Sequence, residues 1–249
     1  MRTANPALND KTFDGFRGAA LPASESMTID GTVNKSVFLL ALVLAPAYWV
    51  WRLFFTTQNP AAILPWMWVG VIGGFVVALV TVFRRQWSPF TAPLYAALEG
   101  LALGGISAIA EMRFPGIVIQ AVALTFGTLF CLLGIYKAGI IKATENFKLG
   151  VVAATGGIAL LYLLSFVLGF FGIRIGFIHE SGLPGIGFSI FVVVVAALNL
   201  VLDFDFIENG AEKGAPKYME WYAAFGLMVT LIWLYIEILR LLSKLRGRR

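Results

Sequence analysis

The stretch SGLPGIGFSIFVVVVAALNLVL, residues 181–202, contains no Asp, Glu, Lys or Arg, and it sets the fold class. A helix that crosses the hydrocarbon core of a membrane needs roughly 20 predominantly apolar residues. Residues 114–136 and 149–173 are equally free of charge. With 59% hydrophobic residues and a mean hydropathy of +0.84, the chain is too apolar for a water-soluble fold. The sequence therefore predicts an all-α protein that crosses a membrane several times.

Similar apolar segments on both sides of this stretch predict a seven-transmembrane helical bundle. The connections are short, as expected between antiparallel neighbours. The predicted spans are 36–56, 64–83, 89–110, 114–136, 149–172, 184–204 and 218–241, so residues 36–249 form one transmembrane domain. Residues 1–35 are polar and carry both charge signs, which predicts an N-terminal tail. Within it, MTIDGTVNKS at 27–36 could order against the bundle.

The Lys and Arg residues between the spans predict the orientation of the chain, because cytoplasmic loops carry an excess of them. The side that includes the tail holds Arg2, Lys11, Arg17, Lys35, Arg84, Arg85, Lys137, Lys142 and Lys148. The opposite side holds Arg52, Arg113 and Arg174. We therefore predict a cytoplasmic N-terminus. Seven crossings then place the C-terminus outside, although it ends in the basic sequence KLRGRR at 244–249.

Glycines in two spans predict places where helices approach closely. Gly100, Gly104 and Gly105 lie in the third span, and Gly156 and Gly157 lie in the fifth. Small residues at such spacings let the backbones of neighbouring membrane helices come into contact.

The chain holds few residues suited to enzymatic or metal-centred chemistry. It has one histidine, His179, and one cysteine, Cys131, whereas zinc sites need several such ligands. Its glycines lack the Lys-Ser/Thr partner of a phosphate-binding loop. The net charge of +5 is accounted for by basic loops between spans. We therefore predict no enzyme, no cofactor and no nucleic-acid partner.

Carboxylates inside the apolar segments are the candidate functional residues. Ionisable groups at membrane depth are costly, so they tend to face a protein interior or an aqueous path. Glu99 lies too deep in the third span to cap a helix. Glu237 is embedded in the seventh span, and Arg240, three residues later, shares its helix face. Glu237 and Arg240 could therefore form an internal ion pair.

Two aspartates close the sixth span. Asp203 and Asp205 are two residues apart, so on a helix they point in nearly opposite directions. Asn199, four residues before Asp203, lies on the Asp203 face. One interpretation places one aspartate inside the bundle and the other at the membrane interface. In the alternative interpretation, both acids only mark the cytoplasmic end of the helix.

The predicted orientation places Glu99, Asp203, Asp205 and Glu220 in the cytoplasmic half of the membrane and Glu237 in the outer half. Oxygen ligands of this kind suit protons or hard cations such as Ca²⁺. The candidate residues for an ion pathway or a pH sensor are Asp203, Asp205, Glu99, Glu220, Glu237 and Arg240. The sequence leaves a metal site undefined.

Four segments carry a resemblance to a known family: NKSVFLLALVL (34–44), EGLALGGIS (99–107), LDFDFIENG (202–210) and WLYIEILRLL (233–242). Together with the span count and the polar tail, they resemble the Bax inhibitor-1 family of transmembrane BAX inhibitor motif proteins, in particular its bacterial YccA-like branch. The resemblance covers about 27–245. It implies a seven-helix bundle with a central C-terminal helix in the bacterial inner membrane.

The resemblance also implies a pH-sensitive Ca²⁺ leak, governed in bacterial members by an aspartate pair on spans six and seven. Asp203 or Asp205 can take the position on span six. The matching position on span seven falls near Thr230, which is no acid, so this chain departs from the pattern there. Glu220 or Glu237 could substitute.

Two functions of different classes follow from these observations. The first is a passive, pH-sensitive Ca²⁺ or general cation channel, with Ca²⁺ as the transported ion. The alternative is an interaction protein that modulates a membrane protease or another integral partner, as YccA-like proteins are thought to do. In both cases the lipid bilayer is the immediate surrounding.

Overall fold

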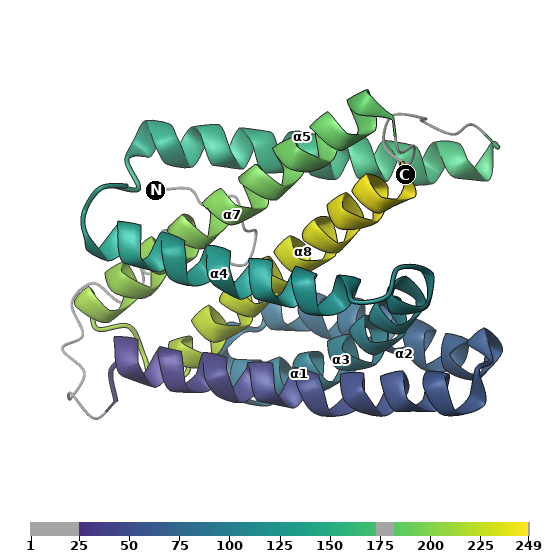
Figure 1. Ribbon diagram of the computed structural model, residues 1–249. Coiled ribbons are helices and arrows are strands. Elements are labelled where there is room, and N and C mark those ends of the chain that lie inside the picture. Colours follow the sequence, from purple (N-terminus) through teal and green to yellow (C-terminus); the bar gives the residue numbers. More distant parts are fainter. Residues whose placement is uncertain (1–24, 173–181, 249) are drawn as a thin grey trace. The chain divides into compact units, whose positions relative to one another are not determined.

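The computed structural model describes residues 25–172 and 182–248, and in this part of the chain seven helices are long and apolar enough to cross a membrane. Figure 1 shows these helices as long coils. They are α1 (Ile29–Thr57), α2 (Pro60–Phe83), α3 (Ser88–Arg113), α4 (Ile117–Lys137), α5 (Glu145–Phe170), α7 (Leu183–Glu212) and α8 (Met219–Gly247), with a short 3-10 helix η3 (Arg85–Trp87) before α3. No strand occurs among the described residues. The predicted all-α membrane fold is confirmed.

Polar caps explain where several helices begin. The Thr28 side chain accepts a hydrogen bond from the Gly31 N–H and caps α1, while Thr144 caps α5 in the same way through Phe147. Such caps satisfy N–H groups that have no partner inside the helix. Because α1 begins at Ile29, residues 29–35 are helical and not part of the predicted tail. The sequence allowed residues 27–36 to order against the bundle, but it did not predict a helix start there, because the first turns of α1 are polar and lack an apolar pattern.

The chain divides into two compact units. The first, which we call the α1–α3 unit, comprises the described residues of 12–115 and 206–229. The second, the α4–α5 unit, comprises the described residues of 116–205 and 230–249. Helices α7 and α8 therefore contribute residues to both units. Among the seven spans, α8 buries the largest share of its residues.

Close helix packing holds the α1–α3 unit together. A methyl group at Gly100 would lie 2.4 Å from the Val43 carbonyl oxygen of α1, and one at Gly104 would lie 2.4 Å from the Ala47 carbonyl oxygen. On α2, a methyl group at Gly70 would lie 2.6 Å from the Leu98 carbonyl oxygen of α3. Only glycine fits such short backbone distances. The predicted close approach in the third span is confirmed.

The α4–α5 unit contains a separate apolar cluster. Ile158 of α5 packs there with Val192 and Val195 of α7. At Gly156 and Gly157, by contrast, an added methyl group would meet no atom of the described residues within 4 Å. The predicted close approach at these two glycines is therefore wrong within the described structure.

Candidate functional site

The candidate carboxylates are distributed over both units. Asp203, Asp205 and Glu237 belong to the α4–α5 unit, whereas Glu99 and Glu220 belong to the α1–α3 unit. The side chains of Asp203, Glu220 and Glu237 are buried. That all the cytoplasmic-side acids gather in one half of the membrane stays a prediction. Among the described residues no group of three or more His, Cys, Asp or Glu could hold a metal ion, and His179 lies outside the described residues.

Asp205 forms an ion pair with a lysine that sequence analysis assigned to a loop. The Lys148 ammonium lies 2.7 Å from Oδ2 of Asp205, and the Lys148 side chain is 1% exposed. Lys148 stands in the first turns of α5, where Glu145 lies 3.9 Å away as a second, solvent-exposed acid. The pair joins α5 to the end of α7. We call it the Asp205 pair.

Asp203 and its neighbour Asn199 lie on a buried face of α7. The Asn199 side-chain amide donates hydrogen bonds to Oγ1 of Thr155 on α5 at 2.9 Å and to the Val195 carbonyl at 2.8 Å. Asp203, one turn further on, is fully buried. Asp205 remains partly exposed, so the two aspartates have different surroundings, as their spacing predicts. Thr230, which stands where the family resemblance expects an acid, is also buried.

Glu237 lies at the centre of a three-residue cluster in the α4–α5 unit, which we call the Glu237 cluster. Nη1 of Arg240 donates to both carboxylate oxygens of Glu237, at 2.9 and 3.1 Å. The Tyr162 hydroxyl of α5 donates to the same carboxylate at 3.1 Å. The predicted Glu237–Arg240 pair is confirmed. The sequence did not predict the contact of Tyr162 with Glu237, because nothing in the sequence around a tyrosine in an apolar span indicates its hydrogen-bond partner.

The end of α8 is anchored to α7 one turn beyond this cluster. Lys244 is buried, and its ammonium donates to the Gly185 carbonyl at 3.0 Å and to Oγ of Ser189 at 2.9 Å. A lysine counted as part of a basic tail in the sequence is thus held inside the α4–α5 unit.

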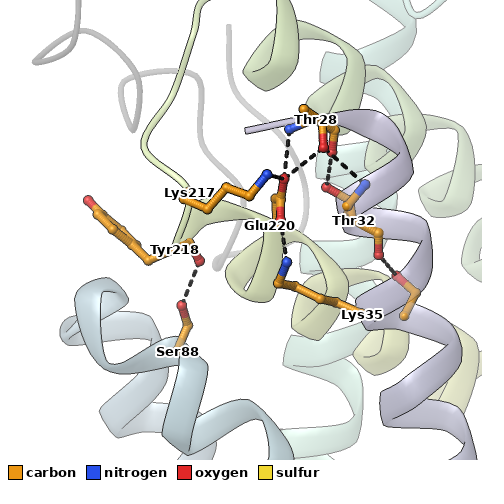
Figure 2. Close-up of polar contacts among 9 residues, drawn as sticks. Thr28, Thr32, Lys35, Ser88, Lys217, Tyr218 and Glu220 are labelled. Atoms are coloured by element: carbon orange, nitrogen blue, oxygen red, sulfur yellow. Dashed lines mark hydrogen bonds and ion pairs between the residues drawn. The ribbon is translucent and has the colours of Figure 1, made fainter. Parts of the chain in front are cut away.

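Glu220 is held from several sides at the start of α8, as Figure 2 shows. The Thr28 backbone N–H and hydroxyl both donate to Oε1, at 2.9 and 2.8 Å. The Lys217 ammonium lies 2.9 Å from the same oxygen, and the Lys35 ammonium donates to Oε2. The carboxylate itself is fully buried. We call these four residues the Glu220 clasp.

A second contact fixes the start of α3 beside the clasp. The Ser88 hydroxyl donates to the Tyr218 carbonyl at 3.0 Å (Figure 2). Burial raises the pKa of the Tyr218 phenol above its usual 10.0, and the nearby Arg85 opposes that rise. The phenol therefore stays protonated at physiological pH and adds no charge to this end of the unit.

Glu99 lies half-buried on α3, opposite a glycine of α2. A methyl group at Gly74 would lie 3.1 Å from Oε1 of Glu99. Tyr95, one turn earlier on α3, forms a side-chain hydrogen bond with the carboxylate. Glu99 is thus a carboxylate inside a membrane span with a neutral hydrogen-bonding neighbour.

Seven membrane-spanning helices with carboxylates buried in the sixth and seventh spans define a polytopic helical membrane protein. The family model described as Bax inhibitor 1 like matches residues 5–247, which is nearly the whole chain. The chain belongs to this family. No curated protein and no solved structure matches it in the corresponding comparisons.

Proposed function

We propose that this protein is a passive, pH-sensitive cation leak of the bacterial inner membrane, with Ca²⁺ as a transported ion and with its N-terminus in the cytoplasm. One observation carries the proposal: Asp203 is fully buried in the membrane-spanning helix α7, two residues from an aspartate that is ion-paired to α5. Membership of the Bax inhibitor 1 like family supports it.

The cost of burying charge supports a functional role for these groups. Ionisable residues inside membrane spans are costly and rare, and they tend to face the bundle interior or an aqueous path. Asp203 is kept nonetheless, inside one of the most apolar helices of the chain. Carboxylate oxygens are the ligands that Ca²⁺ prefers. A role in binding a hard cation on its way through the protein would explain why the Asp203 carboxylate is buried in this helix.

The Asp205 pair supplies a physical basis for pH sensitivity. Loss of the Asp205 charge would take from the buried Lys148 ammonium the carboxylate that lies 2.7 Å away, while Glu145, at 3.9 Å, is a solvent-exposed acid. A buried charge without a partner is strongly unfavourable. The packing of α5 against α7 would then change. A local change of charge at the pair would in this way shift the equilibrium between two packing arrangements of these helices.

Ion flux from liposomes that hold the purified protein alone tests the proposal. A channel needs no other component, so entrapped Ca²⁺ should leave these liposomes faster than protein-free ones. A protein that only modulates a membrane protease or another integral partner would give no flux. Asp205→Asn and Lys148→Met, measured in the same liposomes, should both flatten the pH dependence because each removes one charge of the pair.

A further inference from the structure

The segment before α1 is joined to the turn between α7 and α8 by backbone hydrogen bonds. The Met27 N–H donates to the Ala215 carbonyl at 2.6 Å, and the Lys217 N–H donates to the Glu25 carbonyl at 2.8 Å. An isolated antiparallel bridge links the two segments between these bonds. The Met27 side chain is buried. Residues 25–28, which we call the strap, therefore lie along the turn like a short strand.

Glu220 ties the strap to two helices at once. Its buried carboxylate accepts two hydrogen bonds from Thr28 at the end of the strap, and it binds the ammonium groups of Lys35 on α1 and Lys217 in the turn. Hydrogen bonds with an ionised partner are among the strongest in proteins. A methyl group at Gly31 would lie 2.2 Å from the carboxylate, so any larger residue there would displace the Glu220 side chain.

We propose that the strap and the Glu220 clasp hold the start of α8 against α1, and that opening this clasp raises cation flux through the protein. The second part rests on the proposed function. Two lysines already neutralise Glu220, so we assign it to this conformational role and not to the ion pathway.

The link to flux follows from the continuity of α8. This helix runs from Met219 to Gly247 and carries Glu220 as well as Glu237 and Arg240 of the Glu237 cluster. When its first turn is released, the helix gains access to arrangements that are rarely populated in the closed protein. A passive leak increases with the population of such open arrangements.

Amide hydrogen exchange of residues 215–222 in the full-length protein, reconstituted in lipid nanodiscs, tests the clasp without relying on flux. Glu220→Gln keeps the hydrogen-bond acceptor for Thr28 but removes the charge that the lysines bind. We expect exchange to become about tenfold faster, as for the loss of a charge-assisted hydrogen bond. Gly31→Ala should have a similar effect because the new methyl group displaces the carboxylate.

Gly150→Ala is the matched control, since a methyl group there meets no described atom within 4 Å. It should leave the exchange of residues 215–222 unchanged. If Glu220→Gln does not fold, Lys217→Met removes one ion pair from a side chain that is 48% exposed and should give a smaller acceleration. The proposed role of the clasp would be overturned if exchange stays unchanged in Gly31→Ala and also in Glu220→Gln, or in Lys217→Met where that variant replaces it.

Ca²⁺ flux from liposomes, measured on the same variants, tests the second part. Glu220→Gln and Gly31→Ala should leak faster than the wild type, and Gly150→Ala should not. Faster exchange with unchanged flux would overturn the coupling between clasp and leak. A wild type without any flux would contradict the proposed function and this coupling, and the clasp would then be judged by hydrogen exchange alone.

Discussion

The Lys148 ammonium lies 2.7 Å from the Asp205 carboxylate, and neither side chain is more than 16% exposed. This pair links the start of α5 to the end of α7 with opposite charges in a largely apolar surrounding. Breaking a buried ion pair by removing one partner costs far more than losing a surface pair, because the remaining charge stays buried. The pair is therefore a specific point at which charge, stability and helix packing are coupled.

Lys148→Met should destabilise the protein by about 3 kcal/mol, because Asp205 then loses its buried counter-ion. Thermal unfolding in detergent, followed by circular dichroism, measures the change. Lys137→Met is the control, since Lys137 is exposed at the end of α4. Lys148→Met combined with Asp205→Leu should recover most of the loss. If the double variant is as unstable as the two single losses added together, the two residues do not interact.

Gly104→Ala should destabilise the α1–α3 unit by about 1–3 kcal/mol, the usual cost of overpacking a tight contact. The new methyl group would lie 2.4 Å from the Ala47 carbonyl oxygen, a distance that backbone atoms cannot tolerate. Gly156→Ala is the control, because nothing described lies within 4 Å of it, and helix propensity should stabilise it by up to about 1 kcal/mol. Equal unfolding temperatures for the two variants would argue against the α1–α3 contact.

Arg240→Gln should cost about 1.5–3 kcal/mol, the range for hydrogen bonds to charged groups, because the buried Glu237 carboxylate loses its cation. Tyr162→Phe should cost about 1 kcal/mol. Since both residues bind one carboxylate, their effects should not add in the double variant. The exposed Arg113, changed to Gln, serves as the control. Strict additivity in this double-mutant cycle would contradict a cluster around Glu237.

Helix positions and local pairs could be predicted from the sequence. The seven apolar segments fix the spans because each must match the thickness of a membrane. The Glu237–Arg240 pair follows from helical spacing alone, and the tight contacts at Gly100 and Gly104 follow from the small-residue pattern.

Contacts between distant segments could not be predicted in the same way. Lys148 looks like a loop lysine because it directly precedes an apolar run, and only the packing of α5 against α7 reveals its partner. Thr28 and Glu220 are separated by 192 positions, and no local pattern relates them. The first turns of α1 look like part of the tail because they are polar. The contacts that stabilise them come from the distant Glu220 carboxylate, which no local pattern reveals.

Glu99→Gln should fold normally and reduce Ca²⁺ flux several-fold. The amide keeps the size and hydrogen bonding of the side chain, including the bond with Tyr95, but removes the negative charge inside the span. Circular dichroism checks the fold, and efflux from liposomes measures the leak. A variant that folds and leaks like the wild type would assign Glu99 to helix packing against Gly74.

The central claim is that the protein leaks Ca²⁺, and that this leak depends on pH and on Asp203 and Asp205 near the end of α7. The most direct measurement is Ca²⁺ efflux from liposomes that hold only the purified protein, recorded between roughly pH 5 and 8, for the wild type, Asp203→Asn and Asp205→Asn. We expect wild-type flux that changes with pH, with a flattened response in the variants and the larger change in Asp203→Asn, which lies on the Asn199 face. No flux at any pH, or wild-type pH profiles in both variants, would contradict the account.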